Sequence, residues 1–128
     1  MLKNISKSLK ETGHALIVIP SLESMIFSAW RMIDWYKKEG TAPEKIETSE
    51  LSGFVNKKTD ILQGLVSING VTTKHYTREE MEVVFPRCGL SIINVEKIEY
   101  TWNSEFASPP KWMNDPYPWD WLVMCSKK

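Results

Sequence analysis

The residues best suited to acid–base chemistry are His75 and Tyr76, which stand side by side just before a predicted helix. An imidazole titrates near neutral pH, and a phenol can share a proton with it, so the pair could serve as a general acid or base. A structural or solvated role is the common alternative for a histidine at such a position. His75 and Tyr76 are therefore candidate catalytic residues, and both interpretations stay open at this point.

Three further residues are candidates for contact with a substrate. Pro20 and Ser21 follow directly after an apolar run, and ligands of open α/β sheets bind beyond the carboxyl ends of the strands. Trp112 lies in a proline-rich stretch where neither helix nor strand spacing explains burial of its ring, so it could line a ligand or a protein interface. Pro20, Ser21 and Trp112 are therefore candidate substrate-binding residues.

Several classes of site and partner are disfavoured. Cys88 and Cys125 lack the close Cys or His partners of a zinc site, and we expect them to be reduced, buried side chains and the chain to bind no metal. The sequence has 16 basic and 16 acidic residues, which gives no general attraction to nucleic acid or an anionic membrane. The longest apolar run is too short to span a bilayer, and no secretory signal is recognisable, so we expect a cytoplasmic location.

The spacing of apolar residues predicts the first elements that would position these candidates. Residues 15–20 are apolar without alternation, which indicates a strand covered on both faces. Ser21 can cap a helix that runs to about Glu39, with one apolar stripe facing the core. Phe27 and Trp35 lie well off that stripe and need a second contact surface.

The rest of the chain predicts a hairpin, a helix and two strands. Asn-Gly between β-prone residues 65–68 and 71–74 is typical of a hairpin, and Thr77 to Glu80 form a capping box at a helix start. Residues 90–102 resemble a long strand with a bulge near Glu96 and Lys97. Residues 104–118 form a loop, and residues 119–125 form a central strand. At 128 residues we expect a single α/β domain, with residues 41–76 as an excursion that contains the hairpin.

Three segments carry a family resemblance. LKETGHALIVIP at positions 9–20 resembles the L-K-P-G-G segment, apolar strand and proline of class I S-adenosylmethionine-dependent methyltransferases. KHYTREEM at 74–81, followed by Cys-Gly-Leu at 88–90, is similar to the last helix of that family and its entry into strand six. WDWLVMC at 119–125 resembles strand seven. The three segments follow one another in the family's order.

The resemblance covers nearly the whole chain but only the carboxyl-terminal half of the family's fold. It implies a partial Rossmann-like sheet of strands five, seven and six, with the last strand antiparallel, flanked by helices. The Asn-Gly signal adds a small β-hairpin to this fold. The family's cofactor is S-adenosylmethionine, held by a glycine-rich turn that has no counterpart here. The resemblance therefore implies that this chain is half of an enzyme that methylates a small molecule. By itself this half would be inactive and would bind no cofactor.

The same resemblance leaves the strand at residues 15–20 without its neighbour. An apolar strand edge of this kind invites pairing with another chain, so we expect a dimer or association with a separate amino-terminal half. The alternative is a noncatalytic interaction module that uses the exposed edge together with the aromatic face of Phe27 and Trp35. A third hypothesis is a self-sufficient small enzyme that depends on His75.

Overall fold

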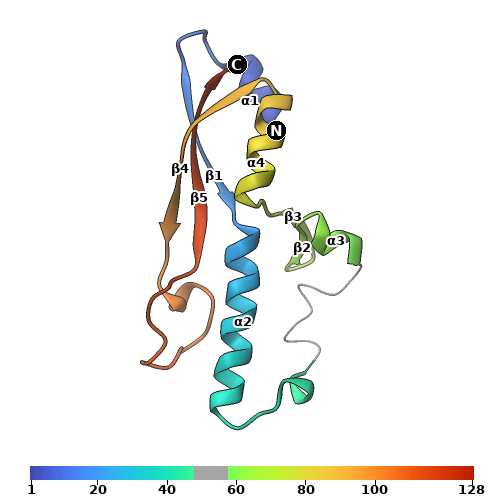
Figure 1. Ribbon diagram of the computed structural model, residues 1–128, viewed down its shortest axis with the longest axis vertical. Coiled ribbons are helices and arrows are strands. Elements are labelled where there is room, and N and C mark those ends of the chain that lie inside the picture. Colours follow the sequence, from blue (N-terminus) through green and yellow to red (C-terminus); the bar gives the residue numbers. More distant parts are fainter. Residues whose placement is uncertain (48–57) are drawn as a thin grey trace.

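The computed structural model describes residues 1–47 and 58–128, in a mixed α/β arrangement of elongated shape. A three-stranded sheet and two helices occupy one end, and a long helix, a loop and a hairpin occupy the other (Figure 1). The helices are α1 (Leu2–Ser8), α2 (Leu22–Lys38), α3 (Lys58–Leu62) and α4 (Arg78–Arg87), and the 3-10 turns are η1 (Pro43–Lys45) and η3 (Trp102–Ser104). The strands are β1 (His14–Pro20), β2 (Leu65–Ile68), β3 (Val71–Lys74), β4 (Leu90–Glu99) and β5 (Trp119–Lys127).

The larger sheet has the order β1-β5-β4, and β5 runs antiparallel to both neighbours. The prediction that the last strand is central is thus confirmed. The Asn-Gly hairpin is also confirmed, because β2 and β3 pair around Asn69 and Gly70, which have φ values of 49° and 79°. Part of the predicted excursion at 41–76 falls outside the described residues.

The predicted position of the bulge is wrong. The register between β4 and β5 shifts between Ile92 and Asn94, so Ile93 is the extra residue, and no shift occurs at Glu96 or Lys97. Ile92 and Val95 consequently face the same side of the sheet, whereas simple alternation would put them on opposite sides. The strand also ends at Glu99, before Trp102.

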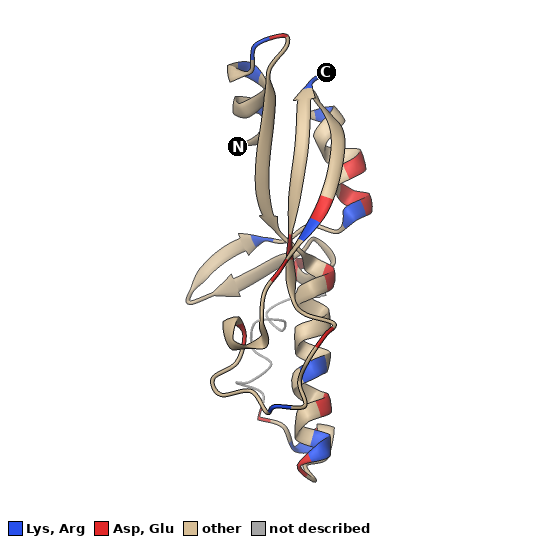
Figure 2. Cartoon of the chain, turned by 90° about the vertical axis from the view of Figure 1, so that its left-hand side faces the viewer, with Lys and Arg blue, Asp and Glu red and all other residues tan. Residues whose placement is uncertain are grey.

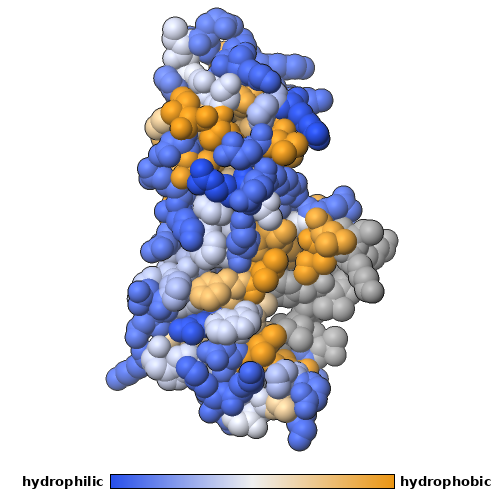
Figure 3. Space-filling model, in the orientation of Figure 1, coloured by the Kyte–Doolittle hydropathy of each residue, from blue (hydrophilic) through white to orange (hydrophobic). Residues whose placement is uncertain are grey.

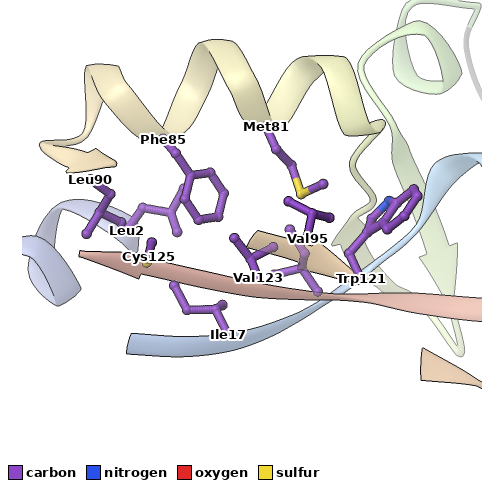
Figure 4. Packing of buried hydrophobic residues seen from close by; sticks show 10 residues of the cluster. Leu2, Ile17, Met81, Phe85, Leu90, Val95, Trp121, Val123 and Cys125 are labelled. Carbon is purple, nitrogen blue, oxygen red and sulfur yellow. The ribbon is translucent and has the colours of Figure 1, made fainter. Parts of the chain in front are cut away.

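The hydrophobic core lies between the sheet and the helices α1 and α4 (Figure 4). Met81 and Phe85 of α4 and Leu90, Val123 and Cys125 of the strands are each completely buried. Both cysteines are free, and Cys125 is buried as expected, whereas Cys88 is only half-buried. The core also includes buried residues of α1 and β1, namely Leu2, Ile17 and Ile19.

The opposite face of this sheet is open, so the prediction that β1 is covered on both faces is wrong. Leu16 and Val18 of β1 are 65% and 54% exposed, and Met124 of β5 is 37% exposed beside Leu16. The three strands carry few charged residues (Figure 2). Within the described part of the chain, β1 pairs only with β5, so its other edge is free as well.

The long helix α2 projects away from the sheet and packs against the segment that connects β4 to β5 (Figure 1). The ring centroid of Phe27 lies 5.5 Å from that of Trp102, and the centroid of Trp35 lies 5.9 Å from that of Phe106. The second contact surface expected for Phe27 and Trp35 is therefore part of the same chain. These contacts cover part of the aromatic face on which the interaction-module hypothesis relies, and Phe27 and Trp35 are both half-buried.

Part of the apolar surface of α2 stays exposed. Ile26 is 50% exposed and Trp30 is 55% exposed. Hydrophobic side chains gather over the end of the molecule that holds the sheet and again where α2 meets the hairpin (Figure 3). Of the helices in the described ranges, none has the length and apolar character needed to cross a membrane.

Candidate functional site

A hollow of about 490 Å³ lies beyond the carboxyl end of β1, and we call it the His75 pocket. The end of β1, the first turns of α2, the hairpin, the start of β5 and the segment after β4 contribute to its wall. The lining residues are Pro20, Ser21, Ser24, Met25, Ser28, Ile68, His75, Tyr100, Ser104, Glu105, Trp119 and Asp120.

Backbone hydrogen bonds of Tyr76 place its neighbour His75 beside the junction of β1 and α2. The Tyr76 amide donates to the Pro20 carbonyl at 2.9 Å, and the Tyr76 carbonyl accepts from the Leu22 amide at 3.0 Å. The same carbonyl accepts from the indole of Trp121 at 3.1 Å, which joins this junction to the central strand. The end of the hairpin is thereby fixed to the larger sheet.

Gly64 fixes the other side of His75. The His75 amide donates to the Gly64 carbonyl at 2.7 Å. Gly64 has φ +68°, and a Cβ placed there would lie only 2.1 Å from the His75 carbonyl oxygen. Only glycine suits both the backbone angle and this close approach.

The structure favours a neutral His75 imidazole with its proton on Nδ1. His75 is 6% exposed, and burial lowers its pKa below 6.5, opposed in part by the Thr73 carbonyl and Asp120 and assisted by Lys74. Its Nδ1 lies 3.2 Å from the Thr73 carbonyl oxygen. Since that oxygen can only accept a hydrogen bond, Nδ1 must donate, and Nε2 is left with a lone pair that can take a proton.

Two carboxyl groups and a phenol complete the polar wall of the pocket. The Tyr100 hydroxyl donates to the Asp120 carboxylate at 3.0 Å, and this bond raises the pKa of Tyr100. Glu105 is exposed overall, but it contributes to the lining of the pocket. Partial burial of its carboxyl group, together with the negative charge of Asp120, raises the pKa of Glu105. The pocket thus combines a proton acceptor, hydrogen-bond acceptors and apolar walls, which suits a small polar molecule with an ionisable hydroxyl or amine.

Two serines of the pocket hold the structure together. The Ser21 hydroxyl accepts a hydrogen bond from the Ser24 amide at 3.0 Å and so caps α2, as predicted. The Ser24 hydroxyl accepts from the Trp119 amide at 2.7 Å, which ties α2 to the start of β5. The buried indole nitrogen of Trp119 finds no hydrogen-bond acceptor in the described ranges.

Three of the five predicted site residues, Pro20, Ser21 and His75, meet in the pocket. Tyr76 is not among the lining residues and packs against the core, with the Lys74 ammonium 4.7 Å from its ring centroid. Trp112 is also outside the pocket, with the Lys38 ammonium 4.0 Å from its ring centroid.

The capping box is only partly as predicted. The Thr77 hydroxyl accepts from the Glu80 amide at 3.1 Å. The Glu80 carboxylate lies 2.6 Å from the Lys74 ammonium, a partner that the capping-box pattern does not include. This ion pair links the hairpin to the start of α4, next to His75.

Sequence reasoning missed Tyr100, Glu105 and Asp120. Tyr100 lies in the predicted long strand and Asp120 in the predicted final strand, so pairing of these two strands could have indicated that the residues are close. In the structure Ile98 is opposite Asp120, and Tyr100 follows Ile98 by two residues. Glu105 lies in the connecting segment and has no comparable signal.

In residues 1–47 and 58–128 there is no group of three or more histidine, cysteine or acidic side chains that could hold a metal ion. Searches against protein-family models, curated proteins and solved structures found no match for this chain.

Proposed function

We propose that this chain is the acceptor-binding half of a class I methyltransferase-like enzyme, with the His75 pocket as the site for a small-molecule methyl acceptor. The observation that supports this proposal is the strand order β1-β5-β4 with β5 antiparallel to both neighbours. It corresponds to the order five, seven, six that the resemblance implies. Both α1 and α4 pack on the same face of this sheet.

The open surface of the sheet supports the proposal independently. A sheet of the doubly wound type has helices on both faces, whereas here Leu16, Val18 and Met124 lie exposed on one face. The free edge of β1 borders that face. A cofactor-binding half would add a strand to this edge and helices over the exposed residues.

Residues 1–47 and 58–128 hold no site that fits S-adenosylmethionine. A glycine-rich turn between a strand and a helix normally approaches such a nucleotide-like ligand, but here Pro20 and Ser21 form the turn from β1 to α2. The described glycines with positive φ are Gly40, Gly64, Gly70 and Gly89, which follow helices or lie in the hairpin turn. We therefore expect no methyl transfer by this chain alone.

The contribution of this chain would be to hold the acceptor and receive its proton. A hydroxyl or amine becomes a better nucleophile when its proton passes to a neighbouring base. Nε2 of His75 has the free lone pair for this role, while Tyr100 and Asp120 can orient a polar group of the acceptor.

Calorimetry with S-adenosylhomocysteine tests the missing cofactor site. This product keeps the adenosine and amino-acid parts of the cofactor but lacks the positive sulfonium, so charge attraction alone cannot cause binding. We expect no measurable heat with the isolated chain. Binding at micromolar concentration would show a complete cofactor site and overturn the proposal.

Light scattering tests the uncovered sheet. We expect the chain to self-associate as its concentration rises, because edge and face remain available for contact. Val18→Lys should return it to a monomer, whereas Val83→Lys, at a 47% exposed position on α4, should not. A wild-type chain that stays monomeric at high concentration would contradict the need for a covering partner. Capture of an unrelated protein through the edge of β1 would instead favour the hypothesis of a noncatalytic interaction module.

A further inference from the structure

A second pocket, of about 350 Å³, lies between the last turns of α2 and the segment after η3, and we call it the aromatic pocket. Trp35 and Phe106 supply two of its walls, with ring centroids 5.9 Å apart and planes inclined at 70°. The two rings meet edge to face, and Phe106 also stacks on Trp102, with ring centroids 5.6 Å apart and planes inclined at 12°. The complete lining is Met32, Trp35, Tyr36, Glu39, Glu105, Phe106 and Ala107.

The charged residues of this lining are both acidic. The Trp35 indole donates to the Glu39 carboxylate at 2.8 Å, which holds that carboxylate beside the ring. The neighbouring Lys38 ammonium lies over Trp112 and 3.8 Å from the Asp34 carboxylate, so it is engaged elsewhere. Among the described lining residues there is no lysine or arginine to neutralise Glu39 and Glu105.

The end of α2 adds to the negative potential. Trp35, Tyr36 and Glu39 stand in or just after the last turn of a 17-residue helix, where the helix dipole is negative. Glu105 lines this pocket and the His75 pocket as well. Its carboxyl is partly desolvated beside Asp120, which raises its pKa, and a cation in the pocket would relieve that unfavourable environment.

We infer that the aromatic pocket binds an alkylated ammonium group of a small organic cation. Aromatic faces attract such cations through the ring quadrupole, and the alkyl groups gain free energy on leaving water for apolar walls. The acidic side chains of the lining supply the compensating charge. The volume lies at the lower end of the range for small-molecule sites, which suits a compact head group. This inference does not depend on the proposed methyltransferase role.

Titration of the full chain with choline, and separately with its neutral isostere in which carbon replaces nitrogen, tests the inference. At constant ionic strength, we expect choline to bind about five-fold or more tighter than the isostere, because only choline gains the cation–π and carboxylate attraction. The indole N–H signal of Trp35 should shift in the NMR spectrum, whereas that of Trp30 should not. Equal binding of both probes, or no binding of choline at tens of millimolar, would overturn the inference.

Two variants and a matched control locate the site. Trp35→Leu and Glu105→Gln should each weaken choline binding by about three-fold or more. Trp30→Leu removes a tryptophan from the same helix at a position outside the pocket, and it should leave choline binding unchanged. Circular dichroism checks that the variants fold. Loss of binding in Trp30→Leu to the same degree would contradict the assignment, as would full binding in a folded Glu105→Gln chain.

Failure of this titration would leave the half-enzyme proposal standing. That proposal depends on S-adenosylhomocysteine, which is uncharged at its sulfur, and on the oligomeric state governed by β1. Choline binding depends on Trp35 and Glu105 instead. The two sets of experiments therefore test different residues, and either proposal can be overturned without the other.

Discussion

The Tyr100 hydroxyl donates a 3.0 Å hydrogen bond to the Asp120 carboxylate and thereby joins the residues just after β4 and at the start of β5. Asp120 also acts on the two other titratable side chains of the His75 pocket. Its charge raises the pKa of Glu105 and partly opposes the lowering of the pKa of His75. One carboxylate thus influences the protonation of three neighbours.

Titration of His75 by NMR should give a midpoint below 6.5, because burial of the imidazole disfavours its charged form. The chain has two histidines, so His14→Gln leaves His75 as the single source of imidazole signals. A midpoint at or above 6.5 would contradict the buried neutral state. Since the unfolded chain binds this proton more readily, the stabilisation linked to His75 is present above 6.5 and is lost as pH falls through the folded-state pKa.

Asp120→Asn should lower the His75 midpoint further. The substitution removes the negative charge that favours the imidazolium while keeping the size of the side chain. The same NMR titration in the His14→Gln background measures the change. Glu44→Gln, which removes a carboxylate from the exposed turn η1, is the control and should leave the midpoint unchanged. An unchanged or higher midpoint in Asp120→Asn would disprove the coupling.

Glu105→Gln should stabilise the chain slightly at pH 7. The raised pKa of Glu105 means that its ionised form is disfavoured by folding, so the amide removes an unfavourable charge near Asp120. The gain should be at most about 0.5 kcal/mol, because solvent screens this partly exposed group. It should disappear as pH falls below the folded-state pKa, where Glu105 becomes protonated. Urea unfolding at several pH values measures it, and a loss of stability at pH 7 would contradict it.

Gly64→Ala should destabilise the chain by about 3 kcal/mol and shift the NMR signals of His75, since a Cβ would collide with the His75 carbonyl in a left-handed backbone conformation. Gly70→Ala is the matched control. Gly70 has φ +79° with nothing within 4 Å of a Cβ, so only the backbone strain of about 1 kcal/mol remains. Equal costs for the two variants would show that the close approach to His75 is unimportant.

Val123→Ala and Val18→Ala should differ sharply in stability. Val123 is fully buried between the sheet and its helices, and loss of two methyl groups there should cost about 2 kcal/mol. Val18 is 54% exposed on the open face, and its replacement should cost less than about 0.5 kcal/mol under conditions where the chain is monomeric. Similar costs in urea unfolding would mean that both faces of the sheet are covered.

Local signals predicted much of this fold. Ser21 at the start of α2 and Asn69-Gly70 in the hairpin act on backbone groups within a few residues, so their effect could be predicted without knowledge of the rest. The bulge at Ile93 was misplaced because apolar residues lie on both sides of it and leave the register ambiguous. The exposure of Leu16 was missed because an apolar run indicates a need for cover but cannot show whether the cover is present.

The candidate site was predicted only in part, because the sequence does not show which distant segments meet. Pro20 and Ser21 could be placed by the rule for strand ends, and His75 by its chemistry, but their meeting depends on hydrogen bonds between Tyr76 and the β1–α2 junction. Glu105 lies in a long connecting segment that carries no periodic pattern, and Asp120 follows that segment at the start of β5.

The placement of β5 has a consequence for the order of assembly. The outer strands β1 and β4 make no ladder with each other, and each is bonded to β5, which follows both in the chain. During synthesis the sheet cannot form until residues 119–127 have emerged from the ribosome. Until then β1 and β4 have no strand to pair with. Contacts so distant in sequence slow folding, and we expect a chain truncated before Trp119 to be a target for chaperones rather than a smaller folded protein.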